Sequence, residues 1–242
     1  MSNVLSDAWE TYTENMKLVL LFSIPFIIAF AIPLLAPLPT FVTAGGTFLR
    51  TASIFVNPNV VSLAIVIIAM VFSLLFLSFA FVAISLVVKS RKTHVGIGKR
   101  VIQEIEKYIG KVFATLLVYS LILLAVNVLF YSSGLGPAIT AVVGFIGFAI
   151  IFYVPSAIVV DNKRIGRAVR DSVRLVLRAP QFYVLWLVLL AVVISVADFF
   201  FIAIAGIWAS YIVLIVTSVV VLPYFVILQA ESYMKRFSLL SH

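Results

Sequence analysis

The sequence contains no cysteine and only two histidines, His94 and His242. Without cysteine the chain forms no disulfide bond and no cysteine-ligated metal site. Neither histidine lies in an apolar segment, so we exclude a histidine-based metal site or general base within such segments. Charge is also scarce, because charged residues make up 11% of the chain and hydrophobic residues 64%. This balance is atypical of soluble globular proteins.

Long apolar runs account for the composition. A helix needs about 20 apolar residues to cross a hydrocarbon core of about 30 Å. Six runs are of this order, at residues 18–38, 60–88, 112–131, 136–160, 181–204 and 207–229. They lack the alternation of lipid-exposed barrel strands, which favours helices. The sequence therefore predicts an all-α integral membrane protein, with six transmembrane helices forming a single domain over residues 1–242.

The seventeen lysine and arginine residues divide very unevenly between the two sides of these runs. Arg50 follows the first run, whereas all the others lie near the two ends of the chain or in the segments 89–111 and 163–178. Short loops rich in lysine and arginine stay in the cytoplasm. We therefore expect a multi-pass protein of the cell membrane whose termini and basic loops are cytoplasmic.

The most basic segment, KRIGRAVRDSVRLVLRAP at residues 163–180, is predicted to be an amphipathic helix. At about 100° per residue, its arginines share one face and its valines the other. These arginines are Arg164, Arg167, Arg170, Arg174 and Arg178. Asp171 is close enough in sequence to pair with Arg167 or Arg174. Such a helix is typical of a membrane interface, with its arginines toward phosphate headgroups. Nucleic-acid binding is disfavoured because interleaved aromatic residues are missing and membrane topology already explains the charge.

Two other segments, 4–16 and 97–109, show the same amphipathic pattern. Lys99 and Arg100 lie on the polar face of the second, and we add them to the candidate residues that bind lipid headgroups or a partner. Each pair of runs is thus preceded by a predicted interfacial helix on the cytoplasmic side. The chain is interpreted as three hairpins in pseudo-repeats of about 1–88, 95–160 and 163–230. The alternative is that any basic loop beside a membrane tends to look amphipathic.

Asp198 is the one ionisable residue placed inside an apolar run. Intramembrane carboxylates are costly and suggest a function such as proton or cation coordination. The alternative is a polar packing contact or a position near the headgroups. Candidate partners are Asn127, Arg50, Tyr131 and Tyr211. We take Asp198 and Asn127 as a candidate intramembrane polar site.

Signals for catalysis are nearly absent. The sequence shows no serine–histidine pairing, no nucleotide-binding glycine loop and no pair of intramembrane carboxylates. We therefore predict no catalytic residue, no metal site, no cofactor and no enzymatic activity.

Two stretches resemble a known group of proteins. LSDAWETYTEN before the first run and VPSAIVVDNKRIGRAVRDSVRLVLRAP before the fifth are similar to six-helix membrane families of archaea and bacteria related to the glycerophosphodiester phosphodiesterase membrane domain. Their shared feature is an A-x-x-x-S helix after a polar turn, here Ala168 to Ser172 after Asp161. The resemblance implies a six-helix membrane fold and supplies no functional residues. Some relatives carry a soluble phosphodiesterase, for which these 242 residues leave no room.

Two functions from different classes remain open. The first is a non-catalytic membrane protein in an accessory or membrane-organising role. Its basic cytoplasmic face and amphipathic helices would bind anionic lipid, a protein partner or a second copy, and no nucleic acid. The second is a transporter or channel for a small ion or solute, using Asp198 and the runs kinked at Pro155 and Pro223.

Overall fold

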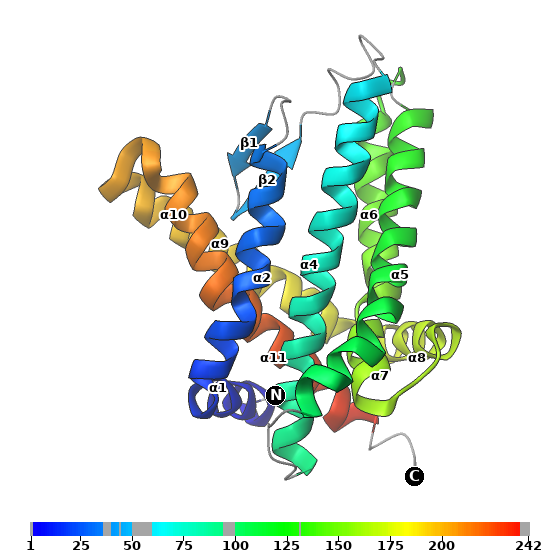
Figure 1. Cartoon of the computed structure of the whole chain (residues 1–242), viewed down its shortest axis with the longest axis vertical. Helices are drawn as coiled ribbons and strands as arrows, with labels where there is room; N and C mark the ends of the chain where they lie inside the picture. The colour runs from blue at the N-terminus through cyan, green and yellow to red at the C-terminus, as the bar shows by residue number, and fades with distance from the viewer. Residues whose placement is uncertain are drawn as a thin grey trace.

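The computed structural model describes residues 2–35, 40–43, 45–49, 60–93, 100–130 and 132–237 (Figure 1). Within them, six helical segments are long and apolar enough to cross a membrane. These are Met16–Leu35, Val60–Arg91, Gln103–Leu129, Gly136–Asp161, Pro180–Ala205 and Ala209–Lys235. Each overlaps one predicted run, so the prediction of a helical membrane protein with six candidate spans is confirmed.

The first span follows a short helix at the end of the molecule that holds both termini (Figure 1). Helix α1 (Ser2–Glu14) and helix α2 (Met16–Leu35) are separated by Asn15 alone. α2 packs along α4 (Val60–Thr93), the longest of the described helices. On α4, the half nearer the termini carries the continuous buried stretch Val82–Val88, which forms the centre of the core.

A β-hairpin interrupts the helical pattern between α2 and α4. Strand β1 (Thr40–Thr43) pairs antiparallel with β2 (Gly46–Leu49). Gly45 in the turn has a φ of 69°, a conformation that favours glycine. A Cβ atom on Gly45 would lie 2.5 Å from Oγ1 of Thr217, so the turn contacts the last span directly. The segment folds back against the helices, and its apolar composition gave no clear strand signal.

The third span differs from the prediction, and the fourth span is broken where the sequence predicted a kink. α5 runs continuously over Arg100–Leu129, so the amphipathic segment 97–109 does not form a separate helix. From Arg100 onward it is the first part of α5, because no proline separates it from the apolar run and the helix continues through the single glycine, Gly110. The fourth span consists of α6 (Gly136–Ile151) and α7 (Val154–Asp161), with Pro155 just after the break. Proline lacks an amide hydrogen and cannot continue the helical hydrogen-bond ladder.

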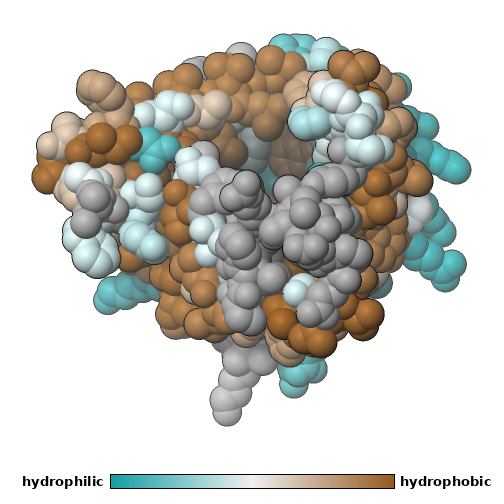
Figure 2. All heavy atoms as spheres, turned by 90° about the horizontal axis from the view of Figure 1, so that it is seen from above, coloured by the Kyte–Doolittle hydropathy of each residue, from teal (hydrophilic) through white to brown (hydrophobic). Residues whose placement is uncertain are grey.

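α8 (Ile165–Arg178) leads into the last hairpin of helices. This hairpin consists of α9 (Pro180–Ala205), the 3₁₀ turn η1 (Gly206–Trp208), α10 (Ala209–Val216), the π-helical segment η2 (Thr217–Val221) and α11 (Leu222–Phe237). α9 and α10 lean away from the bundle of α2, α4, α5 and α6, whereas α11 returns to its base (Figure 1). Seen from the end opposite the termini, the sides are mostly hydrophobic and hydrophilic residues project at the periphery (Figure 2).

Candidate functional site

The arginines of the basic segment form an exposed stripe along α8. Arg164, which caps the helix, and Arg167, Arg170, Arg174 and Arg178 within it are all exposed. The opposite side of α8 carries the buried residues Ala168, Ser172, Leu175 and Val176 and packs on α6 and α7. The protein itself therefore covers the apolar face of α8, and the polar face is left open.

Ser172 fixes α8 to the break in the fourth span. Its Oγ accepts a hydrogen bond of 3.0 Å from the backbone amide of Tyr153, between α6 and α7. Ala168 and Ser172 are both fully buried. In the A-x-x-x-S pattern, the small alanine permits close packing and the serine satisfies an amide at the break, because buried backbone donors need partners. The helix that carries the arginine stripe is therefore fixed to the fourth span.

The only acidic residue of α8 does not neutralise its arginines. Oδ2 of Asp171 lies 3.0 Å from Nζ of Lys163, which corrects the expectation that it pairs with Arg167 or Arg174. Lys163 also contacts Asp161 at 2.8 Å, and it donates to the Tyr233 hydroxyl at 3.0 Å. Tyr233 in turn donates to Asp161 at 2.6 Å. This network joins α7, α8 and α11, and it draws Asp171 toward the loop.

No ion pair is formed by the five arginines of the stripe within the described part of the chain. The stripe thus presents a row of exposed, uncompensated positive charges. Guanidinium groups donate bidentate hydrogen bonds to phosphate and carboxylate groups. The chemistry of this surface is that of an anion-binding site.

A second polar network attaches α1 to the base of the bundle. Arg91 on α4 contacts Glu10 at 3.1 Å and Glu14 at 2.9 Å, and it donates to the Thr11 hydroxyl at 2.6 Å. The Thr11 hydroxyl lies 3.1 Å from Oε1 of Glu231, a fully buried residue of α11. Burial against this region also raises the pKa of the Tyr12 hydroxyl above its ordinary value. α1 is therefore held by polar contacts to both α4 and α11.

Lysines of α4 and α5 surround the ring of Tyr108 at the same end of the molecule. The Tyr108 ring lies within 6 Å of three ammonium groups, namely 5.3 Å from Lys89, 5.2 Å from Lys107 and 5.8 Å from Lys111. Lys89 also donates to the backbone carbonyl of Val159 at 3.0 Å. Contacts of cations with an aromatic face are attractive, so Lys89 helps to hold the start of α5 against α4 and α7, whereas Lys107 and Lys111 lie on α5 itself.

The candidate intramembrane pair is not brought together. Asp198 is partly exposed on α9, whereas Asn127 is partly exposed on α5. α5 packs on α4, α6 and α7, and α9 packs chiefly on α8 and α10. The far parts of α5 and α9 lie on different sides of the molecule (Figure 1). Asp198 makes no hydrogen bond or ion pair with any described residue.

The structure describes only some of the other candidate site residues. Lys99, Arg50 and Tyr131 lie outside the described residues, as does the side chain of Arg100. Tyr211 on α10 is exposed. The described residues also contain no group of three or more histidine, cysteine, aspartate or glutamate residues arranged to hold a metal ion.

Comparison of the chain with protein-family models, curated proteins and solved structures gave no match. The resemblance to the six-helix membrane families therefore stays a prediction.

Sequence reasoning missed the residues that organise the two polar networks. Arg91, Lys163 and Glu231 stand at the ends of apolar runs, where charged residues were treated only as topological signals. Asp7, Glu10 and Glu14 share one face of α1, and this acidic stripe was a usable indication that α1 meets a cation. Nothing local in the sequence indicates that the cation is Arg91, which lies about 80 residues away.

Proposed function

We propose that the protein is a non-catalytic membrane protein whose basic end binds anionic lipid headgroups through the α8 arginine stripe. Its role is then accessory or membrane-organising. The observation that carries this proposal is the set of five exposed arginines that form no ion pair with any residue the structure describes.

The positive charge of the stripe favours binding to a membrane surface that carries phosphate groups. A basic residue close to an anionic leaflet contributes about 1 kcal/mol of attraction. Short basic loops remain on the cytoplasmic side, where anionic lipids give the membrane surface a negative potential. The proposal therefore places α8, α1 and both termini at the cytoplasmic leaflet. The Ser172 hydrogen bond and the Lys163 network hold α8 in place, so little ordering would be needed on binding.

Comparison of matched double substitutions tests this proposal. Purified protein would be titrated with phosphatidylglycerol or phosphatidylcholine, and bound lipid counted by native mass spectrometry. Arg167→Gln with Arg174→Gln removes two charges from the stripe. At about 1 kcal/mol per charge, affinity for phosphatidylglycerol is expected to fall about 30-fold, with little change for phosphatidylcholine.

The control removes two exposed lysines at the same end, Lys17→Gln and Lys107→Gln. It carries the same net charge as the arginine variant but keeps the stripe, so it should retain most of its preference for phosphatidylglycerol. Equal losses in both variants would show that net charge alone governs lipid preference. A wild-type protein without any preference would contradict the proposal and favour a protein partner for the stripe.

Transport is the second candidate, and the breaks in two spans favour it. The fourth span is interrupted before Pro155, and the last contains the π-helical segment just before Pro223. Broken helices form substrate sites in many transporters, and π-helical segments are frequent at functional sites. Proton and cation flux into proteoliposomes, measured for wild type and Asp198→Asn, tests this candidate. Flux that is lost in the variant would replace the lipid-binding proposal with transport.

A further inference from the structure

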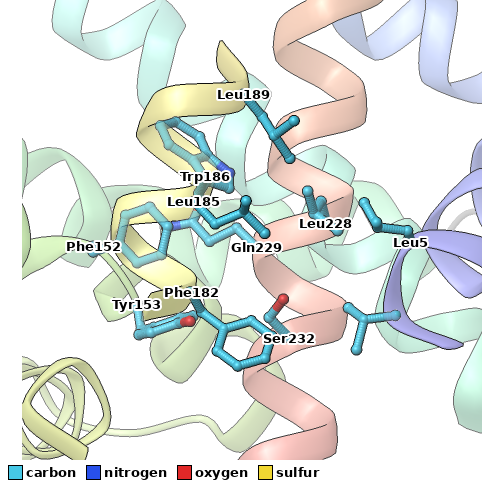
Figure 3. Close-up of a pocket in the computed structure, with 11 residues that line it drawn as sticks. Leu5, Phe152, Tyr153, Phe182, Leu185, Trp186, Leu189, Leu228, Gln229 and Ser232 are labelled. Atoms are coloured by element: carbon cyan, nitrogen blue, oxygen red, sulfur yellow. The ribbon is translucent and has the colours of Figure 1, made fainter. Parts of the chain in front are cut away.

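Most of the surface of α9 is left uncovered by the rest of the described chain. Only its first two turns are anchored inward, where Tyr183 and Trp186 are buried and the Trp186 ring lies 5.1 Å from that of Phe152 (Figure 3). Beyond Trp186, no residue of α9 is buried. From there α9 leans away from the bundle together with α10 (Figure 1), so one side of α9 is open to another molecule in the membrane.

This open side of α9 carries a row of small and medium-sized side chains, which we call the α9 face. Its residues follow one another at alternating intervals of four and three, which places them on one side of a helix. Five of them are exposed and the sixth, Asp198, is partly exposed. The small side chains of Ala191 and Ser195 permit close approach of a second helix. The α9 face consists of Val184, Val188, Ala191, Ser195, Asp198 and Ile202.

Asp198 is the member of the α9 face that requires a partner. It lies seven residues before the end of α9, about 10 Å along the helix axis, and the exposed Phe199 and Phe200 follow it. A carboxyl group within such an apolar surface is costly, and it usually faces protein rather than lipid. Asp198 has no partner among the described residues, and the described lysines and arginines lie near the end of the molecule that holds the termini.

A second copy of the α9 face supplies a partner for Asp198. Side chains of a helix point toward its N-terminus, so the Asp198 carboxyl group lies near the level of the Ser195 hydroxyl. A two-fold symmetric interface uses the same patch on both subunits. The hydroxyl group of Ser195 is a donor and the carboxylate of Asp198 is an acceptor, so the α9 face is complementary to itself.

We propose that two copies of the chain associate in the membrane through their α9 faces. The two α9 helices lie side by side about a two-fold axis along the membrane normal, because both copies have the same orientation in the membrane. The Ser195 hydroxyl of each copy donates to the carboxylate of the partner's Asp198. This proposal does not depend on the arginine stripe, which lies on α8.

Cross-linking of single cysteines tests the contact, because the chain has no cysteine of its own. Ile202→Cys lies on the α9 face, and Ile204→Cys is its matched control. The two isoleucines are 61% and 68% exposed, and at about 100° per residue they point to opposite sides of α9. Each variant would be oxidised with copper phenanthroline in phosphatidylcholine vesicles, at two protein-to-lipid ratios that differ about tenfold.

The contact predicts different results for the two cysteines. A disulfide bond forms only where the two Cα atoms come within about 7 Å. Ile202→Cys should therefore give covalent dimers at both ratios, whereas Ile204→Cys should give few. Equal cross-linking of the two variants, or dimers that decline in proportion to dilution, would show random collision and overturn the dimer.

Substitution of Asp198 tests the polar pair. Energy transfer between copies labelled at Ile204→Cys measures the dimer Kd in vesicles. Asp198→Leu should raise this Kd about tenfold, because two hydrogen bonds between helices are lost. Asp198→Asn keeps an acceptor oxygen and should retain most of the association. The control Asn127→Leu removes a partly exposed polar group from α5 and should leave the Kd unchanged.

The other occupants of the α9 face give different outcomes. An unchanged Kd for Asp198→Leu would overturn the pairing of Ser195 with the partner's Asp198. A protein that stays monomeric at both ratios would overturn the dimer and leave the α9 face to lipid, or to a helix of another protein that brings a basic residue to Asp198. None of these results depends on whether the arginine stripe prefers anionic lipid.

Discussion

Replacing Thr11 with valine should release α1 from the base of the bundle. The Thr11 hydroxyl accepts a hydrogen bond of 2.6 Å from Arg91. It shares its single proton between the carbonyl of Asp7, at 2.8 Å, and the carboxyl group of Glu231, at 3.1 Å. Valine has almost the same shape and no hydroxyl, so packing is retained and both inter-helix hydrogen bonds are lost.

The expected cost follows from the burial of the partners. Thr11 and Glu231 are fully buried, and hydrogen bonds to charged groups contribute about 1.5 to 3 kcal/mol. Arg91 keeps its ion pairs with the half-exposed Glu10 and Glu14, and these contribute less than about 1 kcal/mol each. We therefore expect α1 to be destabilised by about 2 to 3 kcal/mol, most of it from removing a donor beside a buried carboxyl group.

Hydrogen–deuterium exchange of the α1 amides in nanodiscs measures this release. A loss of 2 kcal/mol should raise the local exchange rate about 30-fold, with little change in α5. Thr13→Val is the control, because the Thr13 hydroxyl is exposed and bonds only to carbonyls of its own helix. Similar exchange in the two variants would refute the conclusion that Thr11 connects α1 to α4 and α11.

Two further predictions concern the packing of the fourth span. Ser172→Ala removes the acceptor of the Tyr153 amide. Thermal unfolding in detergent should show that the free energy of unfolding falls by about 1 to 2 kcal/mol. An unchanged unfolding transition would mean that water replaces the hydroxyl. Gly147→Ala would place a Cβ atom 2.7 Å from the Tyr119 ring, whereas the Cβ of Gly144→Ala would meet nothing closer than 3.7 Å. Overpacking typically costs about 1 to 3 kcal/mol of folding free energy. Gly147→Ala should therefore lower the unfolding temperature, whereas Gly144→Ala should not. Equal effects of the two substitutions would contradict the close contact at Gly147.

The helices were largely predictable because each span is a local property of the sequence. About 20 consecutive apolar residues suffice to identify a span, and the predicted break near Pro155 agrees with the gap between α6 and α7. The segment 97–109 was expected to form a helix separate from the third span, but from Arg100 onward it continues into that span within α5. Periodicity reports which face of a helix is polar, but it does not report whether the helix ends.

The hairpin at Gly45 and the polar networks were not predictable for a different reason. The hairpin packs on the last span where Gly45 lies close to Thr217, and the α1 network joins Thr11 to Glu231. Both contacts connect residues from opposite ends of the chain. A single sequence carries no local signal for such pairs, although the acidic face of α1 indicated that a cation lay nearby.

The position of the arginine stripe was predictable from periodicity, but its lack of counter-ions among the described residues depends on the tertiary structure. The chain has nine acidic residues. The ones that form ion pairs with Lys89, Arg91, Lys163 or Lys235 are Asp7, Glu10, Glu14, Glu104, Asp161 and Asp171. These pairs fasten helix ends to one another, and they leave α8 with five like charges that repel each other. Under the proposed function, phosphate groups of anionic lipid would relieve that repulsion, so the acidic residues that stabilise the fold would also leave the stripe free to bind them.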